Sequence, residues 1–198
     1  MDLIYSNEFS NPADWVAETN GTVDMAKGEL RWDCSAATLM GTIWCKRRFD
    51  CPLLVEYQVE SLAGADNINL IVCADTPEGD LLASSAQRTG AYAEYQAFAN
   101  YITTYLTDKE GRSRVRFRKN PGFELLSEAY TEESIVQGKP MTVQSSIDAQ
   151  GNSVLRRDGK ELHRCHVDEP LSPTGYIGLR TWNTFLIYRS FKVFALPA

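Results

Sequence analysis

The sequence has few residues of the kinds that bind transition metals. It contains two histidines, His163 and His166, and no Cys-x-x-Cys pair, so the common zinc-binding spacings are excluded. An odd number of irregularly spaced cysteines also argues against a disulfide framework, and predicts reduced, mostly buried thiols, as in a cytosolic chain. These cysteines are Cys34, Cys45, Cys51, Cys73 and Cys165.

Long apolar runs and a basic excess are also lacking. No stretch approaches the roughly 20 apolar residues of a membrane span, and the first residues lack the basic start and apolar run of a secretory signal. The net charge is −6, which excludes a typical nucleic-acid partner and gives no attraction to anionic membranes. We therefore expect a cytoplasmic protein that binds neither nucleic acid nor membrane.

Motifs for nucleotide and acyl chemistry are missing too. The sequence has no P-loop, no dinucleotide-binding glycine fingerprint and no nucleophile elbow. What it does have is alternation of apolar and polar residues in about a dozen short runs, separated by turn residues at intervals of roughly 8–12 positions. This pattern predicts an all-β antiparallel sandwich that forms one domain over residues 1–198, a length that needs no disulfide or metal to fold.

The alternation predicts which segments are strands. A helical turn is expected within the loop at 76–90 and a short helix at 131–136, where Thr131 precedes two glutamates. Residues 11–15 are expected to form a turn. The expected strands are 3–9, 21–25, 29–34, 38–49, 53–62, 67–75, 91–98, 100–107, 112–120, 123–129, 141–148, 152–157, 160–164, 175–182 and 185–196.

Several of these segments together resemble the YesU-like family of bacterial proteins, within the concanavalin A-like lectin and glucanase superfamily. The similar pieces span nearly the whole chain, and the most specific are RFRKNPGF and GLRTW. The resemblance implies a jelly-roll of two curved antiparallel sheets, with a sugar site on the concave face. It also implies a role in the breakdown of plant cell-wall pectin, especially rhamnogalacturonan, with an oligosaccharide as partner.

Polar and aromatic residues opposite the apolar rows are the candidate substrate-binding residues. Aromatic rings stack on sugar faces, amides bind hydroxyls, and arginine pairs bidentately with a carboxylate such as that of a uronic acid. We expect the following residues to converge on one sheet face: Trp44, Lys46, Gln58, Asn67, Asn69, Arg88, Tyr95, Arg118, Glu128, Arg180 and Trp182.

Each of these residues also has a structural alternative. Arg114, Arg116 and Arg118 point away from Val115 and Phe117, and such a stripe can equally be a solvated face paired with glutamates. Tryptophans are often core residues, and tyrosines are good strand formers. Asn120-Pro121-Gly122 is typical of a turn.

For catalysis, Glu56 is the acid/base candidate, Tyr101 the proton donor, and Arg116 the group that holds an acidic sugar. The ExDxE-type motif of the superfamily's glucanases is absent, and Glu56 and Glu60 lie about 13 Å apart in a straight strand, too far to cooperate directly. The chain is therefore expected to be a glycoside hydrolase or polysaccharide lyase, with two alternatives. One is a non-catalytic lectin-like module, and the other is an interaction domain that dimerises through this face.

No cofactor is expected. The superfamily implies a structural calcium ion on the convex side of many members, for which Asp24 and Glu29 are the candidate ligands here. The residues are compatible with either a monomer or a homodimer.

Overall fold

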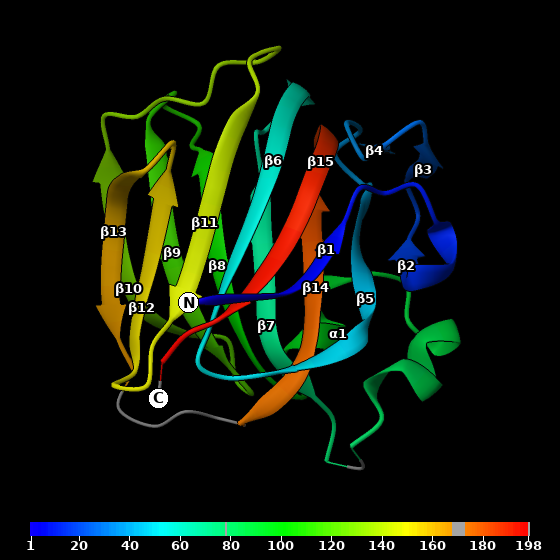
Figure 1. Ribbon diagram of the computed structural model, residues 1–198. Helices are drawn as coiled ribbons and strands as arrows, with labels where there is room; N and C mark the ends of the chain where they lie inside the picture. Colours follow the sequence, from blue (N-terminus) through cyan, green and yellow to red (C-terminus); the bar gives the residue numbers. More distant parts are fainter. Residues whose placement is uncertain (78, 168–172, 198) are drawn as a thin grey trace.

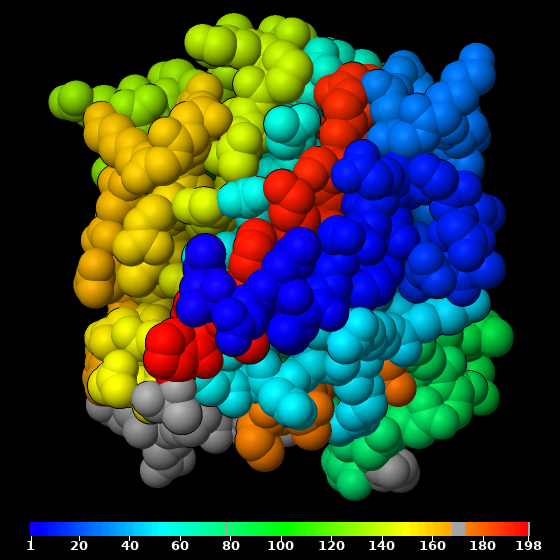
Figure 2. Space-filling view, viewed as in Figure 1, coloured from blue at the N-terminus to red at the C-terminus, as the bar shows by residue number. Residues whose placement is uncertain are grey.

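The computed structural model describes residues 1–77, 79–167 and 173–197, and it consists of two antiparallel sheets packed face to face (Figure 1). The larger sheet contains β1 (Asp2–Asn7), β3 (Thr22–Ala26), β4 (Glu29–Asp33), β6 (Leu53–Gly64), β11 (Met141–Ile147), β12 (Asn152–Arg157), β13 (Lys160–His166) and β15 (Thr184–Ala195). Its strand order is β13-β12-β11-β6-β15-β4-β3, and β1 pairs with β15. From this side, the N-terminal residues lie along the C-terminal strand (Figure 2).

The smaller sheet contains β2 (Trp15–Thr19), β5 (Met40–Asp50), β7 (Ile68–Asp75), β8 (Ala99–Thr107), β9 (Ser113–Asn120), β10 (Glu124–Thr131) and β14 (Thr174–Trp182). Its order is β10-β9-β8-β7-β14-β5-β2. Neighbours in this order are often distant in sequence, as for β14 between β5 and β7. The architecture confirms the predicted all-β, two-sheet antiparallel jelly-roll sandwich.

The core lies between the two sheets and is built by the predicted alternation. In β9, Val115 and Phe117 are buried in this core, and in β6 Val55 and Tyr57 approach it from the other sheet. Because successive side chains of a strand point to opposite faces, the residues between them lie on the outer faces. Phe9, which follows β1, adds to this core, and its ring stacks on that of Trp15, with ring centres 5.1 Å apart.

A covering segment, residues 81–98, packs on the outer face of the smaller sheet. It contains the 3-10 helix η2 (Leu81–Gln87) and the one-turn helix α1 (Tyr92–Tyr95), so the prediction of a strand at 91–98 is wrong. Leu81, Tyr95 and Phe98 of this segment form a second apolar cluster with Trp44 of β5. Their burial on an already formed sheet offsets the unfavourable nucleation of so short a helix.

Gly90 allows this segment to approach the sheet closely. Its φ is +90°, and a Cβ atom there would lie 2.5 Å from the carbonyl oxygen of Glu18 and 2.7 Å from Cα of Gly41. Glu94 then reaches back, accepting hydrogen bonds from the N–H groups of Thr89 and Gly90 at 2.9 and 3.0 Å. These bonds hold the start of α1 in the manner of a capping box.

One further prediction of local structure is wrong. Residues 132–136 form no helix, because their backbone bonds to distant strands: Arg157 donates to the carbonyl of Ser134 at 2.6 Å. The turn predicted at 11–15 is present as the short 3-10 helix η1 (Pro12–Asp14), closed by a bond from the N–H of Asp14 to the carbonyl of Asn11, and it leads into β2, a strand that the alternation did not reveal. Among the described residues, each helix is only a few residues long, far shorter than a membrane span needs.

Candidate functional site

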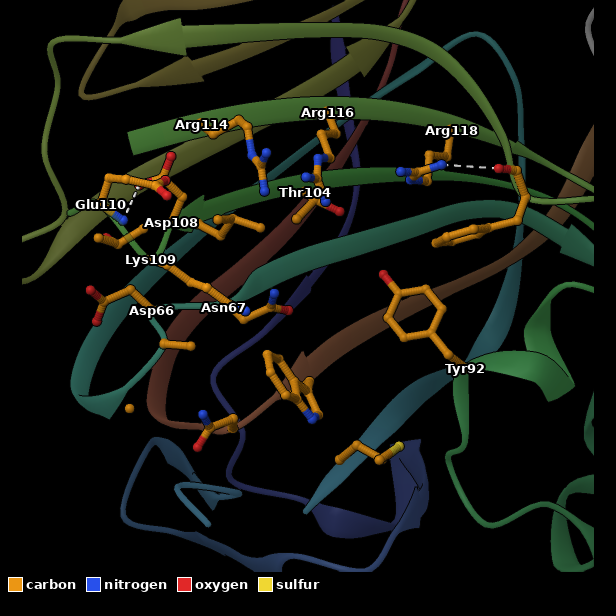
Figure 3. A pocket seen from close by; sticks show the side chains of 18 residues that line it. Asp66, Asn67, Tyr92, Thr104, Asp108, Lys109, Glu110, Arg114, Arg116 and Arg118 are labelled. Atoms are coloured by element: carbon orange, nitrogen blue, oxygen red, sulfur yellow. Dashed lines mark hydrogen bonds between the residues drawn. The ribbon is translucent and has the colours of Figure 1, made fainter. Parts of the chain in front are cut away.

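A hollow of about 1040 Å³ lies over the outer face of the smaller sheet. It is slightly larger than the roughly 300–1,000 Å³ of typical small-molecule sites. Strands β8 and β9, the end of β14 and the residues between β6 and β7 line it, and α1 and the turn after β9 supply one end (Figure 3). The described residues that line it are Met40, Gly64, Ala65, Asp66, Asn67, Tyr92, Thr104, Leu106, Thr107, Asp108, Lys109, Glu110, Arg114, Arg116, Arg118, Phe123, Trp182 and Asn183.

Three arginines of β9 form a row along this hollow, as Figure 3 shows. The neighbouring strand β10 supplies Glu128, whose Oε2 lies 2.6 Å from Nε of Arg116 and 3.5 Å from Nη1 of Arg114. The hydrogen bond from Arg116, together with the nearby guanidinium charges, lowers the pKa of Glu128. Glu128 is therefore a carboxylate at neutral pH, and it partly neutralises the first two arginines.

Arg118, the third arginine of the row, pairs with no carboxylate among the described residues. Its Nη1 donates to the carbonyl of Phe123 at 3.0 Å, and its guanidinium lies over the Phe123 ring, 4.1 Å from the centre. Burial, followed by the charge of Arg116, lowers the pKa of Arg118. Since a guanidinium stays protonated at physiological pH, Arg118 offers an uncompensated positive charge to an anionic ligand.

Two aromatic side chains, of Trp182 and Tyr92, also line the hollow. Trp182, at the end of β14, is 38% exposed, and its Nε1 donates to the carbonyl of Ala37 at 2.9 Å. That bond orients the indole while leaving a ring face accessible. Tyr92 projects from α1 toward the arginine row (Figure 3). Planar rings beside donors of fixed geometry are suited to a ring-shaped, hydroxyl-rich ligand.

The opposite end of the hollow is acidic. Asp66 is 6% exposed and accepts from the Ser61 hydroxyl at 2.7 Å and the Gln137 amide at 3.1 Å. Asp108 and Glu110 both pair with Arg112, at 3.0 and 3.2 Å. These carboxylates have partners of their own, so the net positive charge of the hollow lies toward Arg118.

Buried amides support the base of the hollow. Asn69 is fully buried, and its Oδ1 accepts from the hydroxyl of Thr104 at 2.6 Å. Its Nδ2 donates to the side chain of Asn67 and to the carbonyl of Arg180. Asn69 thus orients Asn67 rather than facing the hollow itself.

The structure brings a part of the predicted set together. Asn67, Arg116, Arg118 and Trp182 line the hollow, and Glu128 holds the arginine row. Lys46 is exposed but does not line it.

Three other predicted residues face the same side of the sheet but are covered by residues 81–98. Trp44 and Tyr95 are fully buried in the second apolar cluster. Arg88 grips the buried Glu18 of β2 through Nε and Nη2, at 2.9 and 2.5 Å, and Tyr95 donates its hydroxyl to the same carboxylate at 2.9 Å. The predicted substrate-binding role of these three does not fit their positions, because Trp44 packs beneath the covering segment and the polar groups of Arg88 and Tyr95 anchor that segment to Glu18.

Glu56 and Gln58 lie on the larger sheet, so the prediction that they share a face with the arginines is wrong. Their strand pairs with β11 and β15. Glu56 contacts Lys192 at 3.2 Å and Gln144 at 2.7 Å on the outer face of that sheet. Alternation assigns a side chain to one face of its own strand, but it does not say which of two sheets the strand joins.

Tyr101 points into the core between the sheets, which also contradicts its predicted placement. It is 6% exposed and belongs to the core, and the neighbouring Thr103 contacts Ser145 of the other sheet at 3.2 Å. The opposite face of β8 carries Ile102, Thr104 and Leu106. Both faces of this strand are buried and both mix apolar residues with threonine, so the pattern did not distinguish them.

The sequence reasoning missed Tyr92, Phe123 and the 108–110 turn. Tyr92 was assigned to a strand, and Phe123 was taken only as the start of one. One signal was present, since Phe123 follows a Pro-Gly turn directly after the arginine strand, and residues at strand ends often carry function. The contact between the two rings, with centres 5.0 Å apart, depends on tertiary structure.

The residues do not fit the calcium ion that the fold suggests. Among the residues described, no group of three or more His, Cys, Asp or Glu side chains is placed to hold a metal. Glu29 is instead held by Arg189 at 2.7 Å and Arg31 at 3.4 Å. Neither Asp24 nor Glu29 therefore belongs to an oxygen cage of the kind that calcium needs.

Comparison with known proteins identifies a family and a fold. A family model described as a domain of unknown function, DUF6250, matches residues 37–191, well over half of the chain. No curated protein matches the sequence significantly. Among solved structures, a Bacillus subtilis protein of unknown function with a galectin-like fold superimposes with a TM-score of 0.83 at 20% identity, covering 98% of this chain and 96% of that one.

Two other similar structures have names that refer to carbohydrate binding or lectins. The carbohydrate-binding module CBM66 from Bacillus subtilis has a TM-score of 0.62 at 11% identity, over 91% of this chain and 94% of that one. A legume lectin-like domain from Entamoeba histolytica has a TM-score of 0.67 at 10% identity, over 93% and 91%. At such low identity these likenesses establish the concanavalin A-like fold alone.

Proposed function

Since the chain belongs to the DUF6250 family, whose description assigns no function, we propose from the site itself that the hollow binds an acidic oligosaccharide. The observation that carries this proposal is Arg118, a partly buried guanidinium without a carboxylate partner among the described residues, which lines the same hollow as the partly exposed ring of Trp182. Arginine binds a carboxylate through a planar fork of donors, and an indole stacks on the apolar face of a sugar.

A uronate satisfies both groups at once. Its ring presents C–H groups to the indole while its carboxylate pairs with the guanidinium, and its hydroxyls match Asn67 and Thr104 at the base. The similarity of this fold to a carbohydrate-binding module and a lectin-like domain supports a sugar as the ligand. Membership of the YesU-like group, and hence a pectin or rhamnogalacturonan fragment as the natural ligand, belongs to the same proposal.

The positions and pKa of the candidate carboxylates favour sugar binding without catalysis. Glycoside hydrolysis needs an acid and a base on either side of the bond, and the pKa of Glu128 is lowered, which suits a permanent anion and not a proton donor. Glu56 lies on the other sheet.

A polysaccharide lyase is the second candidate, and one observation favours it. The Tyr92 side chain extends into the hollow toward Arg118 (Figure 3). A lyase requires a group that neutralises the uronate and a tyrosine or similar residue that transfers the proton. In that reaction the C–H bond next to the carboxylate loses its proton to the base, a C=C bond forms, and the C–O bond to the leaving sugar breaks while its oxygen takes up a proton. The unsaturated product absorbs in the ultraviolet.

Titration calorimetry with trigalacturonate and with its carboxyl-reduced, neutral counterpart tests the proposal. We expect binding of the acidic trisaccharide, weakened about 10- to 100-fold in Arg118→Met, since one hydrogen bond to a charged group is lost. Trp182→Ala is expected to weaken both sugars. Glu56→Gln is the matched control and should bind like the wild type, because it alters the other sheet.

The same samples separate binding from turnover. A rise in ultraviolet absorbance with time that is abolished in Tyr92→Phe supports the lyase, and unchanged trisaccharide supports a binding module. Equal affinity of wild type and Arg118→Met for the acidic sugar contradicts the proposed site.

A further inference from the structure

Arg180 carries a buried charge that this protein leaves without an ion-pair partner among the described residues. The side chain projects from β14 and is fully buried. Its Nη1 donates to the Thr42 hydroxyl at 3.2 Å and to the carbonyl of Gly90 at 2.9 Å. Nε and Nη2 have no hydrogen-bond partner. Buried charges are normally paired, because removing them from water costs several kcal/mol.

The carboxylates nearby are already engaged. Glu18, fully buried, is bound by Arg88 and by the Tyr95 hydroxyl. Glu94 accepts from the backbone of Thr89 and Gly90 and from the Thr89 hydroxyl. The buried layer under residues 81–98 thus holds two guanidiniums, of Arg88 and Arg180, and one buried carboxylate.

The unpaired edge of Arg180 is the edge that binds carboxylates elsewhere in this protein. Arg88 holds both oxygens of Glu18 with its Nε and Nη2. The same two nitrogens are the ones without a partner in Arg180. Their N–H groups lie in the guanidinium plane along one edge, in the geometry of a bidentate pair with a carboxylate.

Tyr92 separates this guanidinium from the hollow. Its ring lines the hollow, which Arg180 does not, and the guanidinium carbon of Arg180 lies 4.0 Å from the centre of the same ring. Its edge packs against Phe123, which in turn stacks on Arg118. Rotation of one side chain on the one-turn helix α1 therefore connects the hollow to Arg180.

We propose that Arg180 is a second carboxylate subsite, closed by Tyr92, that binds the acid group of a uronate once the tyrosine ring turns aside. The proposal rests on the hollow being a site for an acidic sugar, and adds that two arginines, Arg118 in the open and Arg180 beneath the ring, each bind a carboxylate. Such a site distinguishes oligomers with repeated acid groups from those with one.

Arginine labelling with phenylglyoxal, followed by peptide mass analysis, tests the gate. Arg180 is expected to be unreactive in the wild type and in Tyr92→Phe, and to be labelled in Tyr92→Ala. D-galacturonate should protect it in Tyr92→Ala, and D-galactose should not. Labelling of Arg118, which lines the hollow, in every variant without sugar is the internal control. An unreactive Arg180 in Tyr92→Ala, or labelling that galacturonate leaves unchanged, overturns the proposal.

Calorimetry with trigalacturonate tests the contribution to binding. Arg180→Met is expected to bind the acidic trisaccharide about 10- to 100-fold more weakly than the wild type, with no change for the neutral counterpart. Arg189→Met, on the larger sheet, is the matched control.

If wild type and Arg180→Met bind the acid equally, the subsite is refuted while the hollow remains a sugar site. If the wild type binds neither sugar, the proposed function fails, and the labelling result decides the subsite alone. If Arg180→Met does not fold, labelling again decides it, because the arginine is retained there.

Discussion

Replacing Glu18 by glutamine tests whether a buried ion pair holds the covering segment on the sheet. The Glu18 side chain is 0% exposed and that of Arg88 is 10% exposed, and the carboxylate accepts three hydrogen bonds. Glutamine keeps one accepting oxygen and turns an amide donor toward the other donors. Arg88 is then a buried charge without a counter-ion, a change that costs about 3–5 kcal/mol.

For a chain of 198 residues this loss corresponds to a fall in Tm of about 6–20 °C. Calorimetric and urea-induced unfolding measure it directly. The double variant Glu18→Gln/Arg88→Met removes the uncompensated charge, so it should lose less stability than the sum of the two single variants. An exposed pair provides the control: Glu161→Gln, facing Arg164 at 2.9 Å with side chains 38% and 54% exposed, should cost about 1 kcal/mol or less. A loss below about 1 kcal/mol in Glu18→Gln refutes the reasoning.

Three further outcomes are expected. Glu128→Gln removes the carboxylate that partly neutralises the arginine row, so trigalacturonate should bind more tightly and with a steeper salt dependence. Titration calorimetry at two ionic strengths measures both effects, and weaker binding contradicts the placing of the ligand's carboxylate beside these arginines. Burial lowers the pKa of His163 below its ordinary 6.5. As the pH falls, the unfolded chain therefore binds a proton at this residue before the folded chain does. The stability that the neutral imidazole contributes should be lost as the pH falls from about 7 toward the folded pKa. Urea unfolding across this range should show that the free energy of unfolding depends less on pH in His163→Gln than in the wild type. An identical pH dependence contradicts the assigned role of His163. Gly90→Ala should destabilise the fold by about 1–3 kcal/mol or more, as measured by thermal unfolding, because both the positive φ and the neighbouring backbone oppose a Cβ atom. Gly159→Ala is the control: it also has a positive φ, but the space around it is open, so it should lose less stability.

Strands and their buried faces could be predicted from the sequence where one face of the strand is apolar and the other polar. In β9, valine and phenylalanine alternate with three arginines, and the predicted facing is confirmed. In β8, both faces carry apolar residues because the covering segment buries the outer one, and Tyr101 was assigned to the wrong side. Alternation contains information about facing only when the two environments differ.

The candidate site was predictable in part for the same reason. Arg116 could be assigned to an outer face because it lies between Val115 and Phe117, and Arg118 continues the same alternation in β9. Asn67 directly precedes β7, where it alternates with Ile68. Glu56 satisfies the same rule, yet it lies on the other sheet, because the pairing of β6 with β11 and β15 joins segments far apart in the chain. Tyr92 follows no strand alternation, and its position depends on Gly90 and on the apolar cluster beneath α1.

The amino-acid sequence by itself determined an all-β chain with alternating strands, a row of arginines opposite a core face, and a composition without metal-binding spacing or a basic excess. These are local properties, set by neighbours along the strand. Only the tertiary structure decided which sheet each strand joins, which polar residues share the hollow, and which arginines find a carboxylate. Those outcomes depend on contacts between distant segments, and such contacts exist only once the two sheets have closed around the core and residues 81–98 have packed over one of them.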